Sequence, residues 1–230
     1  SYPTKHLFGS LGTARRLTNT GLKETSMSDA PATIPAALRE AAATFGDRPA
    51  YVFEGNTLTY AELLDRVRSA ASGFVTMGLQ PADRVVIWGP NSLDWAVAAL
   101  AASYAGATVV PANSRYVAPE VADLVERTHA RLVLVADGFL GKTQIADLQA
   151  TGKATNTAII NLSDGLDPIA DQADPGIDID AIAAAVSPDD IADILFTSGT
   201  TGRSKGVMSA HRQSVGVARV WGELGGVNEA

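Results

Sequence analysis

The sequence predicts an α/β fold, with a doubly wound and largely parallel sheet that has helices on both faces. From Arg84 onward, short continuous runs of apolar residues alternate with segments of helical periodicity. Strands that are apolar without alternation are buried on both faces, as in parallel sheets whose strands are joined through helices. The runs expected as strands are Val85 to Trp88, Thr108 to Val110, Leu132 to Val135, Ala158 to Ile160 and Ile191 to Phe196.

The segment before these strands is expected to form a helix, a hairpin and a second helix. Apolar residues recur at helical spacing from Ile34 to Phe45. The turn residues Glu54-Gly55-Asn56 separate two short strand-like runs, which predicts a hairpin. Thr59 and Glu62 have the spacing of a capping box, and one apolar stripe follows them. We expect these apolar faces to lie in the core.

Three more helices are expected between the strands, over Ser92 to Tyr104, Pro119 to Thr128 and Phe139 to Ala150. His129 follows the second of them. We interpret this imidazole as a favourable cation at a helix C-terminus, not as a metal ligand.

Aspartates dominate the approach to the last strand. Between Lys153 and Arg203 the chain has no Lys or Arg. The spacing of its aspartates fits neither an EF-hand loop nor a catalytic pair, so we expect a solvated surface connection and no metal site. These aspartates are Asp164, Asp167, Asp171, Asp174, Asp178, Asp180, Asp189, Asp190 and Asp193.

Composition excludes several classes of protein. The 230 residues are 46% hydrophobic and 19% charged, as in ordinary soluble domains, and the net charge of −7 argues against nucleic acid as a partner. Without cysteine there is no disulfide framework, thiolate zinc site or cysteine nucleophile, which fits a cytoplasmic location. The longest apolar run, Trp95 to Val110, is shorter than the ~20 residues of a membrane span.

The first residues differ in composition from the rest. Residues 1–26 are rich in Ser and Thr and carry four basic residues against one acid. This balance resembles a transit peptide, but Met27 resembles an ordinary start, so we expect an upstream extension without a role in the fold. The predicted organisation is therefore an extension over residues 1–32 and a domain over residues 33–230.

One stretch, Thr197 to Val207, carries a recognisable chemistry. It reads Thr-Ser-Gly-Thr-Thr-Gly-Arg-Ser-Lys-Gly-Val. Glycines let the backbone approach a ligand, successive N–H groups form an anion-binding concavity, and hydroxyl and ammonium groups add donors. This predicts a loop that binds a nucleoside triphosphate. Its candidate ligand-binding residues are Thr197, Ser198, Gly199, Thr200, Thr201, Gly202 and Lys205.

Two competing motifs do not fit this stretch. A Walker loop needs Gly-Lys-Ser/Thr before a helix, whereas Lys205 lies between Ser204 and Gly206. The Gly-x-Ser-x-Gly pattern around Ser204 matches a nucleophile elbow. That elbow needs an acid and then a histidine downstream, but the only downstream histidine, His211, precedes both acids.

The residues after the loop predict its setting. Val207 to Ala210 can form a strand, which would make the loop a turn between two strands with no helix dipole aimed at the phosphates. Arg203 and Lys205 must then supply more of the positive charge. Val217, Val220, Trp221 and Leu224 form a helix face, and we expect Trp221 to be a core residue and not a platform for base stacking.

This loop, with Asp193 to Phe196 before it and Val207 to Arg212 after it, resembles the phosphate loop of the adenylate-forming (AMP-binding) enzymes. These include acyl-CoA synthetases, firefly-type luciferases and peptide-synthetase adenylation domains. Further segments occur in the family's order, namely Leu58 to Leu63, Arg84 to Ile87 and Tyr104 to Pro111. Ser204 stands where the family usually has proline. Arg-Ser-Lys followed by Gly-Val-Met-Ser-Ala-His is most similar to actinobacterial ligases for long-chain fatty or steroid-derived acids.

The resemblance implies a function. A carboxylic acid would attack the α-phosphorus of ATP, giving an acyl-adenylate and pyrophosphate, and CoA would then accept the acyl group. Thr197, Ser198, Thr200, Thr201 and the loop amides would bind the β- and γ-phosphates with Mg²⁺, and Lys205 would supply charge. By the family's plan, the catalytic residues and the C-terminal domain follow after Ala230. We therefore expect an incomplete N-terminal domain, inactive alone, with no catalytic residue of its own.

Two alternatives remain open from the sequence. One is an adenylation domain or acyl-AMP ligase that loads a carrier protein. The other is a non-catalytic fragment whose exposed sheet binds a partner chain or aggregates.

Overall fold

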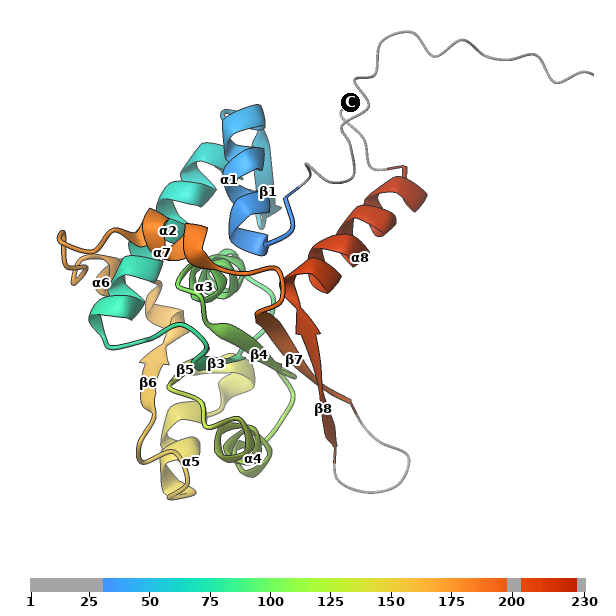
Figure 1. Ribbon diagram of the computed structural model, residues 1–230. Helices are drawn as coiled ribbons and strands as arrows, with labels where there is room; N and C mark the ends of the chain where they lie inside the picture. The colour runs from blue at the N-terminus through green and yellow to red at the C-terminus, as the bar shows by residue number, and fades with distance from the viewer. Residues whose placement is uncertain (1–30, 198–203, 227–230) are drawn as a thin grey trace, which may run out of the picture. The chain divides into compact units, whose positions relative to one another are not determined.

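The computed structural model describes residues 31–197 and 204–226, which belong to one compact unit, Pro31–Ala230. A six-stranded sheet forms its centre (Figure 1). The strands of this sheet are β3 (Arg84–Trp88), β4 (Thr108–Ala112), β5 (Leu132–Val135), β6 (Ala158–Asn161), β7 (Ile191–Thr197) and β8 (Lys205–Ala210).

The strand order in the sheet is β6-β5-β3-β4-β7-β8. Neighbouring strands from β6 to β7 are parallel, and β8 runs antiparallel to β7. The chain moves from β3 to β4 in one direction and then to β5 on the other side of β3, which is the reversal that defines a doubly wound sheet. The predicted fold class is confirmed, and every predicted strand is present.

Helices surround this sheet, and a two-stranded hairpin lies apart from it. The hairpin strands are β1 (Pro49–Phe53) and β2 (Asn56–Thr59). The helices are α1 (Ile34–Phe45), α2 (Tyr60–Thr76), α3 (Leu93–Tyr104), α4 (Ala118–Thr128), α5 (Gln144–Ala150), α6 (Asp167–Ala170), α7 (Ile179–Ala185) and α8 (His211–Leu224), with single 3₁₀ turns at Phe139–Gly141 and Leu162–Asp164. None of the described helices is long and apolar enough to cross a membrane.

Local hydrogen bonds explain where the first helices begin. The Thr33 hydroxyl accepts a hydrogen bond from the Ala36 N–H at 3.2 Å and caps α1. In α2 the predicted capping box is present: Glu62 Oε2 accepts from the Thr59 N–H at 2.8 Å, and the Thr59 hydroxyl accepts from the Glu62 N–H. Both contacts satisfy N–H groups that have no partner inside the helix.

The prediction of a helix over residues 139–150 is wrong for the first half of this segment. The structure has a 3₁₀ turn at Phe139–Gly141, and α5 begins only at Gln144. Leu140 and Gly141 have φ values of 57° and 71°, in the left-handed region. A continuous right-handed helix cannot pass through residues in that conformation.

The two faces of the sheet bury two separate sets of side chains. In β3, Val85 and Ile87 belong to the core formed with α2 and α3, whereas Val86 and Trp88 belong to the core formed with α4 and α5. Figure 1 shows these helix pairs on opposite sides of the sheet. Because successive residues of a strand point to opposite faces, both sets must be apolar. This is why the strands are continuous apolar runs.

Helix α2 packs closely against the short helix α6 at a glycine. A Cβ atom built on Gly73 would lie 2.3 Å from the carbonyl oxygen of Ile169 in the short helix α6. Such a distance is far inside van der Waals contact. The absence of a side chain at Gly73 is therefore what lets α6 pack on α2.

The aspartate-rich segment is more structured than predicted. It contains α6 and α7, and Asp180 of α7 is not a simple solvated residue. Its Oδ1 accepts hydrogen bonds from Arg68 Nε at 2.9 Å and from the hydroxyl of buried Tyr104 at 2.5 Å, while its Oδ2 accepts from Arg68 Nη2 at 2.8 Å. Arg68 is the main cause that lowers the pKa of the Asp180 carboxyl. This carboxylate thus joins α7 to α2 and α3.

Candidate functional site

The predicted phosphate loop joins two antiparallel strands. Thr197, the last residue of β7, is paired with Lys205, the first residue of β8. The predicted strand after the loop is confirmed and begins two residues earlier than expected. The loop therefore does not lead into a helix, in contrast to a Walker loop. Ser198, Gly199, Thr200, Thr201 and Gly202 lie outside the described residues.

The two described candidate residues are available to a ligand. Thr197 and Lys205 are both exposed. In the part of the chain that the structure describes, no carboxylate forms an ion pair with Lys205. An exposed ammonium group beside a hydroxyl can serve as a donor to an anionic ligand.

Gly206 allows an aromatic ring to cover the start of β8. It is paired with Phe196 of β7. A Cβ atom on Gly206 would lie 3.0 Å from Ile194 Cγ2 and 3.2 Å from Phe196 Cζ, so the glycine leaves room for both side chains. Ile194 and Phe196 pack against the core under α4 and α5. The hairpin of β7 and β8 is thus held on one side by this core.

Contacts with α8 and α1 fix the other end of the hairpin. The Ser214 hydroxyl of α8 donates to Asp193 Oδ2 of β7 at 2.8 Å. His211, the first residue of α8, is 1% exposed, and its Nδ1 accepts a hydrogen bond from the Ile34 N–H of α1 at 3.3 Å. The buried imidazole of His211, the residue that follows β8, is therefore joined to the start of α1.

We expect this imidazole to make stability depend on pH. Burial lowers the pKa of His211 below its ordinary 6.5, against the opposing effect of Asp190 and Asp193. A histidine with a lowered pKa is neutral in the folded chain, whereas the unfolded chain takes up its proton below about pH 6.5. The free energy of unfolding should thus be independent of this group above about pH 6.5 and fall as the pH decreases below it.

Urea unfolding at several pH values from 7.5 to 5.5 checks this. The variant His211→Gln keeps a hydrogen-bond acceptor but cannot titrate, so its stability deficit relative to the wild type should shrink as the pH falls. His129→Asn, which removes an exposed imidazole at the C-terminus of α4, serves as the control. A constant deficit for His211→Gln across this range would contradict the assignment.

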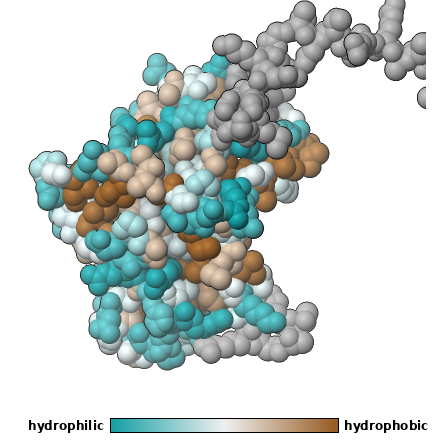
Figure 2. Space-filling view, viewed as in Figure 1, coloured by the Kyte–Doolittle hydropathy of each residue, from teal (hydrophilic) through white to brown (hydrophobic). Residues whose placement is uncertain are grey.

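Trp221 is not a core residue, contrary to the prediction. Its exposed fraction is 75%, and its neighbours on the same face of α8 are also exposed, Val217 to 61%, Val220 to 53% and Leu224 to 84%. Figure 2 shows hydrophobic residues at the surface along this helix. Helical periodicity indicates an apolar face, but it does not indicate whether the described part of the chain covers it.

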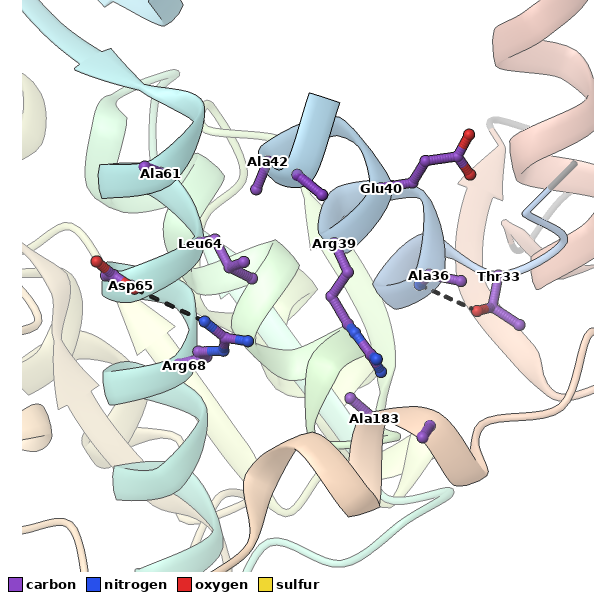
Figure 3. A pocket seen from close by; sticks show the side chains of 12 residues that line it. Thr33, Ala36, Arg39, Glu40, Ala42, Ala61, Leu64, Asp65, Arg68 and Ala183 are labelled. Atoms are coloured by element: carbon purple, nitrogen blue, oxygen red, sulfur yellow. Dashed lines mark hydrogen bonds and ion pairs between the residues drawn. The ribbon is translucent and has the colours of Figure 1, made fainter. Parts of the chain in front are cut away.

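A cavity of about 720 Å³ lies away from the two described ends of the loop, Thr197 and Lys205. It lies between α1, α2 and α7, and Arg39 and Arg68 extend into it (Figure 3). Arg68 is occupied by the carboxylates of Asp65 and Asp180. Of the predicted site residues, the two that the structure describes do not line this cavity.

Another cavity, of about 410 Å³, lies at the carboxyl ends of β3 and β4. Its lining includes Asn91, after β3, and Asn113, after β4. In doubly wound sheets, ligands bind outside the carboxyl ends of the strands, which is the edge of the sheet where this cavity lies. This cavity was not predicted from the sequence, although Gly89-Pro90-Asn91 after one strand and Asn113-Ser114 after the next were available as signals.

The fold and the loop define the class of this protein. Its sheet matches that of a solved Mycobacterium tuberculosis fatty acyl CoA synthetase with a TM-score of 0.66, at 26% identity, over 78% of this chain and 35% of that chain. This is the architecture of adenylate-forming enzymes. A family model described as AMP-binding enzyme matches residues 38–228, and the chain belongs to this family.

Two curated relatives are similar over most of the chain. A 3-(7a-methyl-1,5-dioxo-octahydro-1H-inden-4-yl)propanoyl:CoA ligase of Rhodococcus jostii is 45% identical over an alignment of 213 residues, which covers 86% of this chain and 41% of the relative. The ligase of the same name from Mycobacterium tuberculosis is 42% identical over 84% of this chain and 39% of the relative. The chain thus spans about two fifths of the length of these relatives.

Proposed function

We propose that an enzyme carrying this chain is an ATP-dependent acyl-CoA ligase, in which residues 33–230 form part of the N-terminal domain. The observation that carries the proposal is the exposed Lys205 opposite Thr197, at the two ends of a hydroxyl-rich sequence, in a chain 45% identical to a CoA ligase. Residues 1–32 have no part in the proposed chemistry. We place the reaction in the cytoplasm, where ATP and CoA are both available.

The chemistry has two steps. A carboxylate oxygen bonds to the α-phosphorus of ATP, and the bond from that phosphorus to the bridging oxygen breaks, releasing pyrophosphate. The thiol of CoA then loses its proton to solvent, and the resulting thiolate attacks the acyl carbon and displaces AMP. In the first step negative charge grows on the departing pyrophosphate, and donors placed beforehand at that position stabilise the transition state.

The loop residues are assigned to the pyrophosphate. The Thr197, Ser198, Thr200 and Thr201 hydroxyls and the amides of Gly199 and Gly202 would donate to the β- and γ-phosphates, with the Lys205 ammonium beside them. Mg²⁺ would neutralise the same phosphates when bound. The described residues contain no group of three side chains that could hold a metal, so we assign no protein ligand for Mg²⁺ among them.

We propose a bulky carboxylic acid as the substrate. Both relatives named above act on a propanoyl group attached to a methylated, fused bicyclic diketone. A fatty acid is the second choice, because the fold also matches a fatty acyl CoA synthetase. The named relatives are CoA ligases, which favours CoA over a carrier protein as the acceptor.

The test is acid-dependent exchange of labelled pyrophosphate into ATP by the full-length enzyme. Acids to compare are a bicyclic keto-propanoic acid, a long-chain fatty acid and an aryl acid, followed by mass spectrometry of the CoA product. We expect exchange and thioester formation with the first or second acid. A folded full-length enzyme that exchanges pyrophosphate with none of them would refute the proposal.

The isolated chain provides a second comparison. We expect it to elute as a folded monomer in size exclusion and to bind ATP only feebly, because the loop would be its main contact with the nucleotide. Association into large species without any ATP binding would favour the non-catalytic alternative.

A further inference from the structure

Arg127 of α4 contacts the hairpin where the loop returns to β8. Its Nη2 donates a hydrogen bond to the carbonyl oxygen of Ser204 at 2.8 Å, and its Nη1 lies 3.3 Å from the Ser204 hydroxyl. Arginine has a planar fork of donors, so two contacts to one residue restrict both the position and the orientation of that residue. Ser204 directly precedes β8.

The same guanidinium also covers the strand before the loop. Its central carbon lies 4.7 Å from the centre of the Phe196 ring, in the geometry of a cation–π contact. Phe196 is the residue before Thr197, where β7 ends. One side chain therefore touches a residue of β7 and the residue that precedes β8, and it comes from a helix far away in the sequence.

A carboxylate orients this guanidinium. Asp123, one turn earlier in α4, accepts a hydrogen bond from Arg127 Nη1 at 3.2 Å, and both side chains are only 26% exposed. A partly buried pair is less screened by solvent than a pair on the surface. The donors of Arg127 are thus directed before any ligand arrives.

We infer that Arg127 is a positioning residue for the phosphate loop, an inference that rests on the proposed function. Arg127 touches no reacting atom. It holds Phe196 and Ser204, which are the chain neighbours of Thr197 and Lys205, and it thereby fixes the two described ends of the loop. A ligand site fixed in advance avoids the entropic cost of ordering at the moment of binding.

Hydrogen exchange of the 230-residue chain tests the contact itself. In Arg127→Gln, backbone amides of residues 195–197 and 205–207, at the paired strand ends beside this contact, should exchange about tenfold faster, on the basis of one lost charge-assisted hydrogen bond. Amides near Asp193 and Ser209, at the far end of the hairpin, should not change. The matched control is Arg131→Gln, since Arg131 is exposed and its side chain bonds to no described residue.

Kinetics of the full-length enzyme test the role. For Arg127→Gln we expect kcat/KM for ATP in the adenylation step to fall about tenfold, with an unchanged KM for the acid, and Arg131→Gln should match the wild type. Arg127→Lys keeps the charge but loses the fork, so it should be intermediate. This second variant also decides the question if Arg127→Gln does not fold.

The possible outcomes separate the two proposals. Unchanged exchange at residues 195–197 and 205–207, or faster exchange with unchanged ATP kinetics, would overturn the role of Arg127 and leave the ligase proposal intact. A folded wild-type enzyme that adenylates no acid would instead refute the ligase proposal, and with it the role of Arg127 in a phosphate site.

Discussion

Replacing Lys205 by alanine in the full-length enzyme is expected to lower the rate of adenylation ten- to a hundredfold. The loop lies between two strands, so no helix N-terminus adds its partial positive charge, and the lysine must supply a large share of it. One charge-assisted hydrogen bond contributes about 1.5 to 3 kcal/mol, which corresponds to this range of rates. Pyrophosphate exchange at several ATP concentrations measures the effect.

Two further variants make the Lys205 result specific. Lys205→Arg keeps a positive charge on a different geometry and should retain part of the activity. Lys142→Ala removes an exposed lysine outside the predicted site and should leave the rate unchanged. An adenylation rate in Lys205→Ala equal to that of the wild type would remove this residue from the site.

Replacing Gly73 by alanine should destabilise the chain by about 1 to 3 kcal/mol, the usual cost of overpacking. The new methyl group would meet the Ile169 carbonyl at 2.3 Å, and backbone cannot rotate away as a side chain can. Either α6 must leave α2 or the helix must bend. Urea unfolding of the 230-residue chain measures the loss.

Replacing a glycine of α8 by alanine should instead raise the stability of the chain. Gly216 has no atom within 4 Å of the place where its Cβ would be. Alanine in an exposed helix is favoured over glycine by about 0.5 to 1 kcal/mol, so Gly216→Ala should be more stable than the wild type. Equal effects at the two positions would mean that the contact between α2 and α6 contributes nothing.

The central sheet was predictable because its signals are local and strong. A strand buried on both faces must be apolar throughout, and Leu132 to Val135 cannot be mistaken for a half-exposed strand. Capping residues such as Thr59 and Glu62 act within one turn of their helix, so spacing alone identified them. The helices α6 and α7 were missed because they are too short to show a reliable helical periodicity.

Long-range contacts explain what the sequence could not predict. Arg127 and Ser204 are 77 positions apart, and neither residue type indicates the other. Trp221 has the right spacing for a core residue, yet burial depends on which elements lie against α8. Eleven residues were enough to recognise the chemistry of the loop from the sequence. The contacts of Arg127 beside the loop could be found only from the folded structure.

The pairing of Thr197 with Lys205 has a consequence for how this protein can diverge. These residues form the last described pair of the ladder between β7 and β8. The entropic cost of closing a loop grows slowly with its length. We therefore expect insertions, deletions and exchanges between these two residues to leave the described strand pairings intact, so that the chemistry can change while the scaffold is inherited unchanged.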